Sequence, residues 1–189
     1  MKYSKIIALI LCFSLLQGCT AVVVGGAATG AAAATDRRTL GTQIDDNTIE
    51  LKAGMLLKEA EGLEDHARIV VKSVNGHLLV VGQTPNDYLR ELAIKSLKQI
   101  EGVKRIHNQV RIGSTTSITT RTEDTWITAR IKIKLLTADG VNSNNISVLT
   151  ENAEVYLMGL VTEDEAQKAA DVARNISGVE KVVKVFEIL

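Results

Sequence analysis

The sequence predicts an α+β fold made of two tandem αββαβ domains, each with a three-stranded mixed sheet packed on two helices. An internal repeat supports this: DNTI at 46–49 is matched by DTWI at 124–127, and IEGVK at 100–104 by ISGVE at 176–180. Asn75-Gly76, the strongest short hairpin signal, is matched by Asn152-Ala153. Two copies are too few for a solenoid, so the repeat indicates tandem domains over residues 46–112 and 124–189.

Each copy is expected to begin with a helix, over about 46–60 in the first copy and 124–138 in the second. Two short runs rich in β-branched residues follow each helix. They span 67–74 and 77–82 in the first copy, and 145–150 and 154–160 in the second. A hairpin between the two runs makes these strands antiparallel.

A second helix and a last strand complete each copy. Thr84-Pro85-Asn86-Asp87 supplies an N-cap, a proline at the first helical position and an early acid, while Thr162 and Glu165 form a capping box. Gly102 and Gly178 stand where these helices should end. The last strands, 103–112 and 179–189, should return parallel to the second strand through a right-handed crossover.

The N-terminus is typical of an exported protein. Lys2 and Lys5 precede an apolar run at 6–16 that is too short to span a bilayer. The run ends in LQGC, which resembles the lipobox of bacterial lipoproteins. That resemblance implies removal of residues 1–18 and lipidation of Cys19, and Thr20 in place of aspartate implies the outer membrane. An ordinary signal peptide with an incidental cysteine is the alternative.

Two segments are expected to connect these parts. Residues 19–45 are interpreted as the lipidated cysteine and a tether, because the stretch from 21 to 35 is rich in Ala, Gly and Val without an amphipathic face. A short apolar helix there is the alternative. Residues 113–123 (GSTTSITTRTE) are interpreted as a polar linker between the two copies.

Composition argues against several classes of function. Lys+Arg and Asp+Glu are both 22 and aromatic residues are 3%, so neither a basic field nor base stacking points to nucleic acid. No nucleophile–base pair, metal-ligand cluster or cofactor-binding motif is found, so neither an enzyme nor a cofactor is predicted. The histidines, His66, His77 and His107, are interpreted as surface or hydrogen-bonded residues.

The lipobox, the small-residue tether and the two αββαβ copies, each with a Gly-Val pair before its last strand, resemble the dual BON-domain lipoproteins of Gram-negative bacteria. The resemblance implies a lipid-anchored protein on the inner leaflet of the outer membrane, facing the periplasm. It also implies binding of anionic phospholipid through the second domain and a role in envelope integrity. For such a site we expect a preference for phosphatidylglycerol or cardiolipin.

The first helix of the second copy carries the candidate site. At 100° per residue, one face of this helix, with Ile127, Ile131 and Leu135, is expected to point to the core. Trp126 and Ile133 form a second apolar face away from the core, and Arg130 and Lys134 lie between the two faces. The apolar pair Leu160-Val161 follows Gly159, whereas in the first copy Gln83 follows Gly82. The first copy also has Thr48 at the position of the tryptophan. An amphipathic ring flanked by cations is favoured at a headgroup interface. The predicted phospholipid-binding residues are Trp126, Arg130, Ile133, Lys134, Gly159, Leu160 and Val161.

Two alternatives stay open for this face. Trp126 and Ile133 could pack against the first copy or the linker. The face could also dock a protein, which would make the molecule a periplasmic scaffold for envelope or cell-wall assembly factors, because an exposed apolar patch suits either kind of partner. The first copy is expected to lack such a face.

Overall fold

The computed structural model describes residues 36–189, so residues 1–18, Cys19 and the predicted tether as far as residue 35 lie outside the described residues. Residues 37–189 form one compact unit. Domain 1 contains α3 (Leu40–Glu59), α4 (Leu63–His66), β1 (Arg68–Val74), β2 (His77–Thr84), α5 (Asp87–Leu97) and β3 (Arg105–Ile112). Domain 2 contains α6 (Ile118–Leu136), a 3-10 turn η2 (Ser143–Asn145), β4 (Ile146–Glu151), β5 (Glu154–Val161), α7 (Glu163–Arg174) and β6 (Lys181–Ile188).

The predicted αββαβ order and strand directions are confirmed in both domains. The sheets have the orders β1-β2-β3 and β4-β5-β6. In each sheet the first pair is antiparallel and the second pair is parallel. The hairpin turns at Asn75-Gly76 and Asn152-Ala153 have positive φ at both residues, as a tight two-residue turn requires.

The first helix of each domain begins six residues earlier than predicted. The Thr39 hydroxyl accepts a hydrogen bond from the Thr42 N–H at 3.1 Å, and the Ser117 hydroxyl accepts one from the Thr120 N–H at 3.1 Å. These side-chain caps satisfy backbone donors at the true helix starts. As a result, α6 includes residues 118–123 of the segment interpreted as a linker, and α3 includes 40–45 of the segment interpreted as a tether.

Two buried aspartates, Asp46 and Asp124, hold the hairpin turns of their domains. The buried carboxylate of Asp46 accepts hydrogen bonds from the N–H groups of Asn75 (2.8 Å) and Gly76 (2.9 Å). Asp124 accepts the equivalent bonds from Asn152 (2.8 Å) and Ala153 (2.9 Å). Because buried N–H groups need acceptors, these side chains tie each first helix to its own hairpin.

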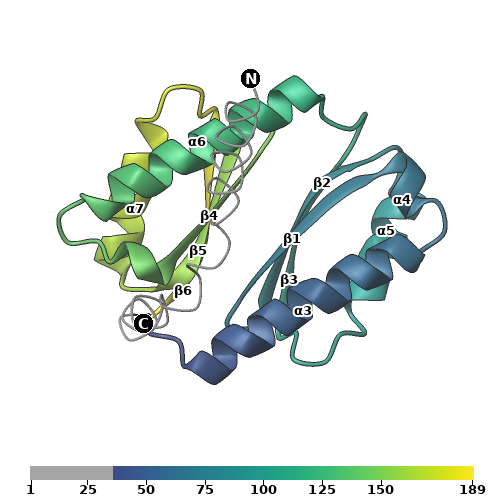
Figure 1. Cartoon of the computed structure of the whole chain (residues 1–189), viewed down its shortest axis with the longest axis horizontal. Coiled ribbons are helices and arrows are strands. Elements are labelled where there is room, and N and C mark those ends of the chain that lie inside the picture. Colours follow the sequence, from purple (N-terminus) through teal and green to yellow (C-terminus); the bar gives the residue numbers. More distant parts are fainter. Residues whose placement is uncertain (1–35) are drawn as a thin grey trace, which may run out of the picture. The chain divides into compact units, whose positions relative to one another are not determined.

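Each domain has its own core between the helices and one face of the sheet. In domain 2 the buried side chains of α6 are those predicted from helical spacing: Ile127, Ile131 and Leu135. In domain 1 the equivalent residues of α3 are Ile49, Ala53 and Leu57. The other face of each sheet is covered too, because the two sheets pack on each other (Figure 1).

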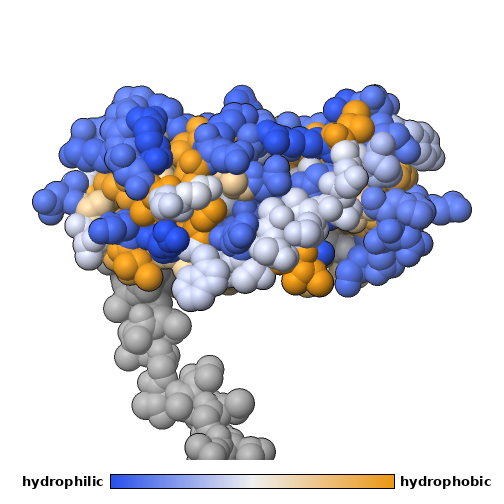
Figure 2. Space-filling model, turned by 90° about the horizontal axis from the view of Figure 1, so that it is seen from above, coloured by the Kyte–Doolittle hydropathy of each residue, from blue (hydrophilic) through white to orange (hydrophobic). Residues whose placement is uncertain are grey.

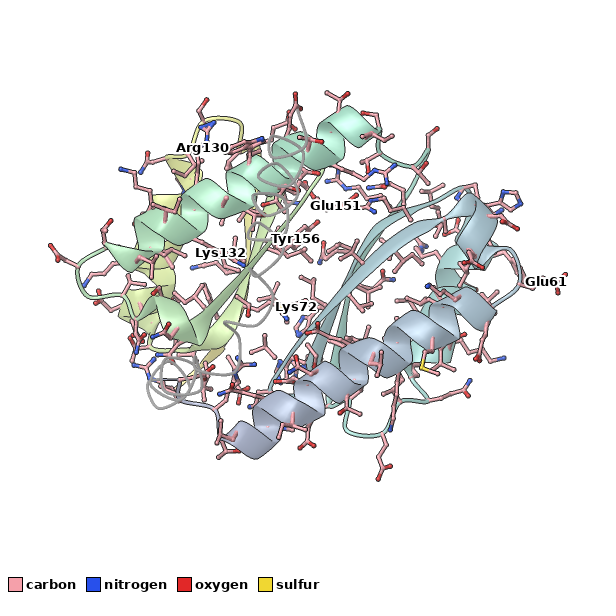
Figure 3. All side chains as sticks on the ribbon, viewed as in Figure 1. Glu61, Lys72, Arg130, Lys132, Glu151 and Tyr156 are labelled. Carbon is pink, nitrogen blue, oxygen red and sulfur yellow. The ribbon has the colours of Figure 1, made fainter. Side chains whose placement is uncertain are left out.

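The contact between the sheets has an apolar centre and charged margins. The centre is a buried cluster from both domains: Val74, Leu79, Val81, Tyr156, Met158 and Val185. At one margin the buried Glu151 carboxylate accepts hydrogen bonds from Gln83 (3.0 Å) and Thr116 (3.2 Å) and lies 3.5 Å from Arg68. Figure 3 shows Glu151 and Tyr156 between the two sheets. Sheet-to-sheet packing therefore joins the two domains.

The expectation that all three histidines are surface or hydrogen-bonded residues is wrong for His107. His66 is exposed, but His77 and His107 lie on neighbouring strands with ring centroids 5.6 Å apart. The Nε2 atom of His107 is buried and has no hydrogen-bond partner among the described residues. Burial, with the neighbouring His77 and Arg105, lowers the pKa of His107, because an imidazolium would be poorly solvated there.

Arg37, which precedes the first helix of domain 1, is bound to domain 2. The Arg37 guanidinium binds both carboxylate oxygens of Glu165 at 2.6 and 3.1 Å and donates to the Leu160 carbonyl at 3.2 Å. The Arg37 N–H also donates to the Asn145 side chain at 3.0 Å. Glu165 is the third residue of α7 and completes the predicted capping box with Thr162. We call this set of contacts the Arg37 clamp.

The Arg37 clamp makes stability depend on acid pH. The bonds from Arg37 lower the pKa of Glu165 from its ordinary 4.5 to about 2, because they stabilise the charged carboxylate. The stabilisation is complete above pH 4.5 and is lost as the pH falls toward 2. We expect Arg37→Gln to cost about 1 to 2 kcal/mol at pH 7, allowing for solvent screening, and almost nothing at pH 2. Urea unfolding at both pH values measures this. An equal cost at both would contradict the prediction.

Candidate functional site

The outer face of α6 carries a row of exposed apolar side chains. Ile118, Trp126, Ile133 and Leu136 are 77%, 65%, 62% and 70% exposed. Helical spacing places them on the side opposite the buried residues of α6. We call them the α6 stripe. Figure 2 looks onto the side where α6 lies in Figure 1 and shows hydrophobic groups among hydrophilic ones. Trp126 and Ile133 therefore pack neither on domain 1 nor on the linker.

Cations border the α6 stripe on both edges. At 100° per residue, Arg130 and Lys134 lie along one edge, and Arg121 and Lys132 along the other. Figure 3 shows Arg130 and Lys132 on α6. None of the four forms an ion pair with another described residue within 4.0 Å. They are therefore free to bind an external anion.

A hollow of about 590 Å³ lies beside the N-terminal half of α6. Trp126 and Arg130 form one wall, the Asn152-Ala153 turn another, and the Ser177-Gly178 loop a third. Glu123 and Glu180 also line it, so the hollow itself is not uniformly positive. The positive charge concentrates instead along the edges of the α6 stripe.

The structure separates two groups of predicted site residues. Trp126, Arg130, Ile133 and Lys134 lie together on the exposed side of α6, whereas Gly159, Leu160 and Val161 lie at the far end of β5. The Trp126 hollow lies against residues 152 and 153, and seven further residues of strand cover roughly 20 Å, so the end of β5 is far from Trp126. It is closer to the C-terminal end of α6, because Lys132 and Leu136 share a hollow with Ile146, and Ile146 pairs with Gly159. The grouping of all seven residues in one site stays a prediction.

The three β5 residues also have structural roles. Val161 is fully buried in the core of domain 2. Leu160 is half-buried, and its carbonyl accepts from Arg37. Gly159 has φ +156°, and a Cβ there would lie 2.0 Å from the Asn145 carbonyl oxygen. Because neighbouring strand residues point to opposite faces, Leu160 and Val161 could not both have faced a ligand.

Domain 1 also has an exposed apolar face, which corrects the expectation that it lacks one. Leu40, Ile44, Leu51 and Met55 on α3 are 54–67% exposed. We call them the α3 stripe. The sequence pattern does not reveal it when the helix is taken to begin at residue 46, because Leu40 and Ile44 then fall in the tether. The two stripes differ in charge: α6 carries four cations and two acids, whereas α3 carries two cations and four acids.

Residues 36–189 contain neither a helix that is both long and apolar enough to cross a membrane nor a group of three His, Cys, Asp or Glu side chains suited to hold a metal ion.

Comparison with known proteins shows which protein family the chain belongs to. The family model named BON domain matches residues 45–114 and 123–189, so the chain is a tandem BON-domain protein and belongs to that family. It is 40% identical to the outer membrane lipoprotein DolP of Haemophilus influenzae, over 92% of this chain and 90% of that protein. It is 40% identical to a 21 kDa hemolysin of Actinobacillus pleuropneumoniae, over 80% of this chain and 78% of that protein. It is 29% identical to osmotically-inducible protein Y of Escherichia coli, over 76% of this chain and 72% of that protein.

Proposed function

We propose that this protein is a lipoprotein of the outer membrane that binds anionic phospholipid through domain 2 and thereby supports envelope integrity. The observation that carries the proposal is the α6 stripe, in which an exposed tryptophan and three large aliphatic side chains are bordered on both edges by cations. Such a surface fits the boundary between headgroups and acyl chains, where rings lie at the interface and cations contact phosphate.

Anchoring at the outer membrane is part of the same proposal. It rests on the LQGC sequence ending at Cys19 and on the similarity to an outer membrane lipoprotein over nearly the whole chain. With the anchor in the inner leaflet, both domains face the periplasm. A scaffold that docks envelope proteins on the α6 stripe is the second candidate, because the same exposed apolar surface favours it.

The edge charges give the first test of the lipid proposal. Each cation close to an anionic surface contributes about 1 kcal/mol. We therefore expect Lys134→Gln to weaken binding to phosphatidylglycerol or cardiolipin vesicles about fivefold at low salt, and less at high salt. The matched control is Lys95→Gln on α5, an exposed lysine of domain 1 outside both stripes, which should leave binding unchanged. Vesicle titrations of residues 20–189 at two salt concentrations measure both.

Two outcomes would count against lipid binding. Equal affinity for phosphatidylethanolamine and phosphatidylglycerol vesicles would mean that charge does not drive binding. No vesicle binding at all by the folded wild-type protein would favour the scaffold.

A further inference from the structure

The α3 stripe is an apolar surface that the proposed lipid site does not use. Leu40, Ile44, Leu51 and Met55 lie within 60° of one another around the helix and run along most of its length. Their side chains are more than half exposed. An exposed apolar row of this kind, interrupted at its middle by Asn47 and Thr48, is typical of an interaction surface. In Figure 1, α3 lies on the opposite side of the paired sheets from α6.

The surface around the α3 stripe is poorly suited to an anionic membrane. Between Leu40 and Glu59 the helix has four acids and two lysines, the reverse of the balance on α6. Asp46 is buried and Glu50 is paired with Lys72, which leaves two exposed acids, Asp45 and Glu59, and two exposed lysines, Lys52 and Lys58. Because the α3 stripe has no excess of cations to attract phosphate groups, a protein surface is the better occupant.

The four residues of the α3 stripe are spaced symmetrically along the sequence. The intervals along the chain are four, seven and four residues. When two α3 helices lie antiparallel, Leu40 of each copy meets Met55 of the other, and Ile44 meets Leu51. A patch that complements itself in this way is what a two-fold axis requires. The axis would pass between Asn47 and Thr48.

The charges beside the α3 stripe have the same symmetry. Asp45 and Lys52 lie on one edge of the stripe, 20° apart around the helix. In the antiparallel arrangement Asp45 lies diagonally across from Lys52 of the other copy, and the axis repeats the pair. A parallel two-fold arrangement would instead place the charged edges of the two copies on opposite sides of the contact, where Asp45 and Lys52 could not pair. Neither residue has an ion-pair partner within 4.0 Å among residues 36–189.

We propose that two copies of this protein associate through antiparallel α3 helices, with the α3 stripes in contact and with Asp45 of each copy paired with Lys52 of the other. Four large side chains per copy form a contact at the small end of specific interfaces. The dimer is therefore weak in dilute solution and gains from co-localisation on one membrane. Because α6 lies on the other side of the molecule, its stripe stays free in the dimer.

Thiol cross-linking in isolated membranes tests the contact on the full-length chain. Thr48 is exposed and next to the proposed axis, so Thr48→Cys with a short bis-maleimide should give a product of twice the monomer mass. The same reaction with the unsubstituted chain is the control for any cross-linked product that forms through Cys19. Thr122→Cys on α6 is the matched control, because Thr122 is exposed on the other side of the molecule. Adding Ile44→Gln and Leu51→Gln should abolish the Thr48→Cys product.

Charge exchange tests the direction of the helices. Asp45→Lys or Lys52→Asp alone, each combined with Thr48→Cys, should lower the cross-linked yield about tenfold, because two opposite-charge pairs become like-charge pairs. Co-producing the two single variants should restore the product, since unlike copies then complement each other.

Three results would overturn the proposal. They are the absence of a double-mass product from Thr48→Cys, a yield unaffected by Ile44→Gln with Leu51→Gln, and a product of any other mass. The last would indicate that α3 docks a different protein. None of these readouts depends on which lipid α6 binds, and failure of the vesicle titrations would not affect them.

Discussion

Trp126→Ala is expected to lower the affinity of residues 20–189 for phosphatidylglycerol vesicles by about 10- to 150-fold. Burying a large aromatic side chain contributes roughly 1.5–3 kcal/mol, and this ring is 65% exposed before binding. The free energy of unfolding should stay nearly unchanged, because the buried face of α6 is formed by Ile127, Ile131 and Leu135. A vesicle titration together with thermal unfolding measures both quantities.

The matched control for this prediction is Tyr88→Ala. Tyr88 is an aromatic residue on α5 of domain 1 and is 72% exposed. Its removal should leave vesicle binding unchanged. If Trp126→Ala bound as tightly as wild type, or if Tyr88→Ala lost as much affinity, α6 would not be the lipid-binding element.

Gly159→Ala is expected to destabilise the protein by about 3 to 5 kcal/mol and to lower Tm by about 10 °C. Gly159 has φ +156°, and a Cβ would lie 2.0 Å from the Asn145 carbonyl oxygen next to the neighbouring strand, far inside van der Waals contact. The backbone at the start of β4 would have to move. Gly82 is the equivalent residue of domain 1, where a Cβ would lie 1.9 Å from the Arg68 carbonyl oxygen.

Gly54→Ala is the control for the glycine prediction. Gly54 lies inside α3, and a Cβ added there would have nothing within 4 Å, so alanine should stabilise the protein by about 0.5 to 1 kcal/mol. Denaturant unfolding compares the two variants. Equal effects of Gly54→Ala and Gly159→Ala would refute the steric explanation. If Gly159→Ala kept its stability but lost lipid binding, the end of β5 would be part of the lipid site.

The features predicted correctly from the sequence are those that local chemistry decides. The Asn75-Gly76 turn, the Thr162 capping box and the helical spacing of Ile127, Ile131 and Leu135 depend on neighbours within a few residues. The exposed position of Trp126 follows from the same spacing. Comparison of the two copies also places the unpaired cations on the first helix of domain 2.

The features that the sequence pattern does not reveal depend on contacts between distant residues. Sheet-to-sheet packing joins Leu79 of one domain to Met158 of the other. A signal for it is present in the unbroken apolar runs 78–81 and 155–158, because strands buried on both faces do not alternate. The distance between Leu160 and Trp126 is hidden for a similar reason, since a repeat alignment gives position in a strand but not distance across the domain.

The Arg37 clamp sets how far the proposed membrane anchor and domain 2 can separate. Eighteen peptide units join Cys19 to Arg37, so the leash has a maximum reach of about 60 Å. Because Arg37 is held on domain 2, this limit applies directly to the proposed lipid-binding domain, without the length of domain 1 added to it. Anchored as proposed, the α6 stripe would search only the volume within this reach of the bilayer, where an intrinsic affinity too weak to hold a free protein is enough for repeated capture and release.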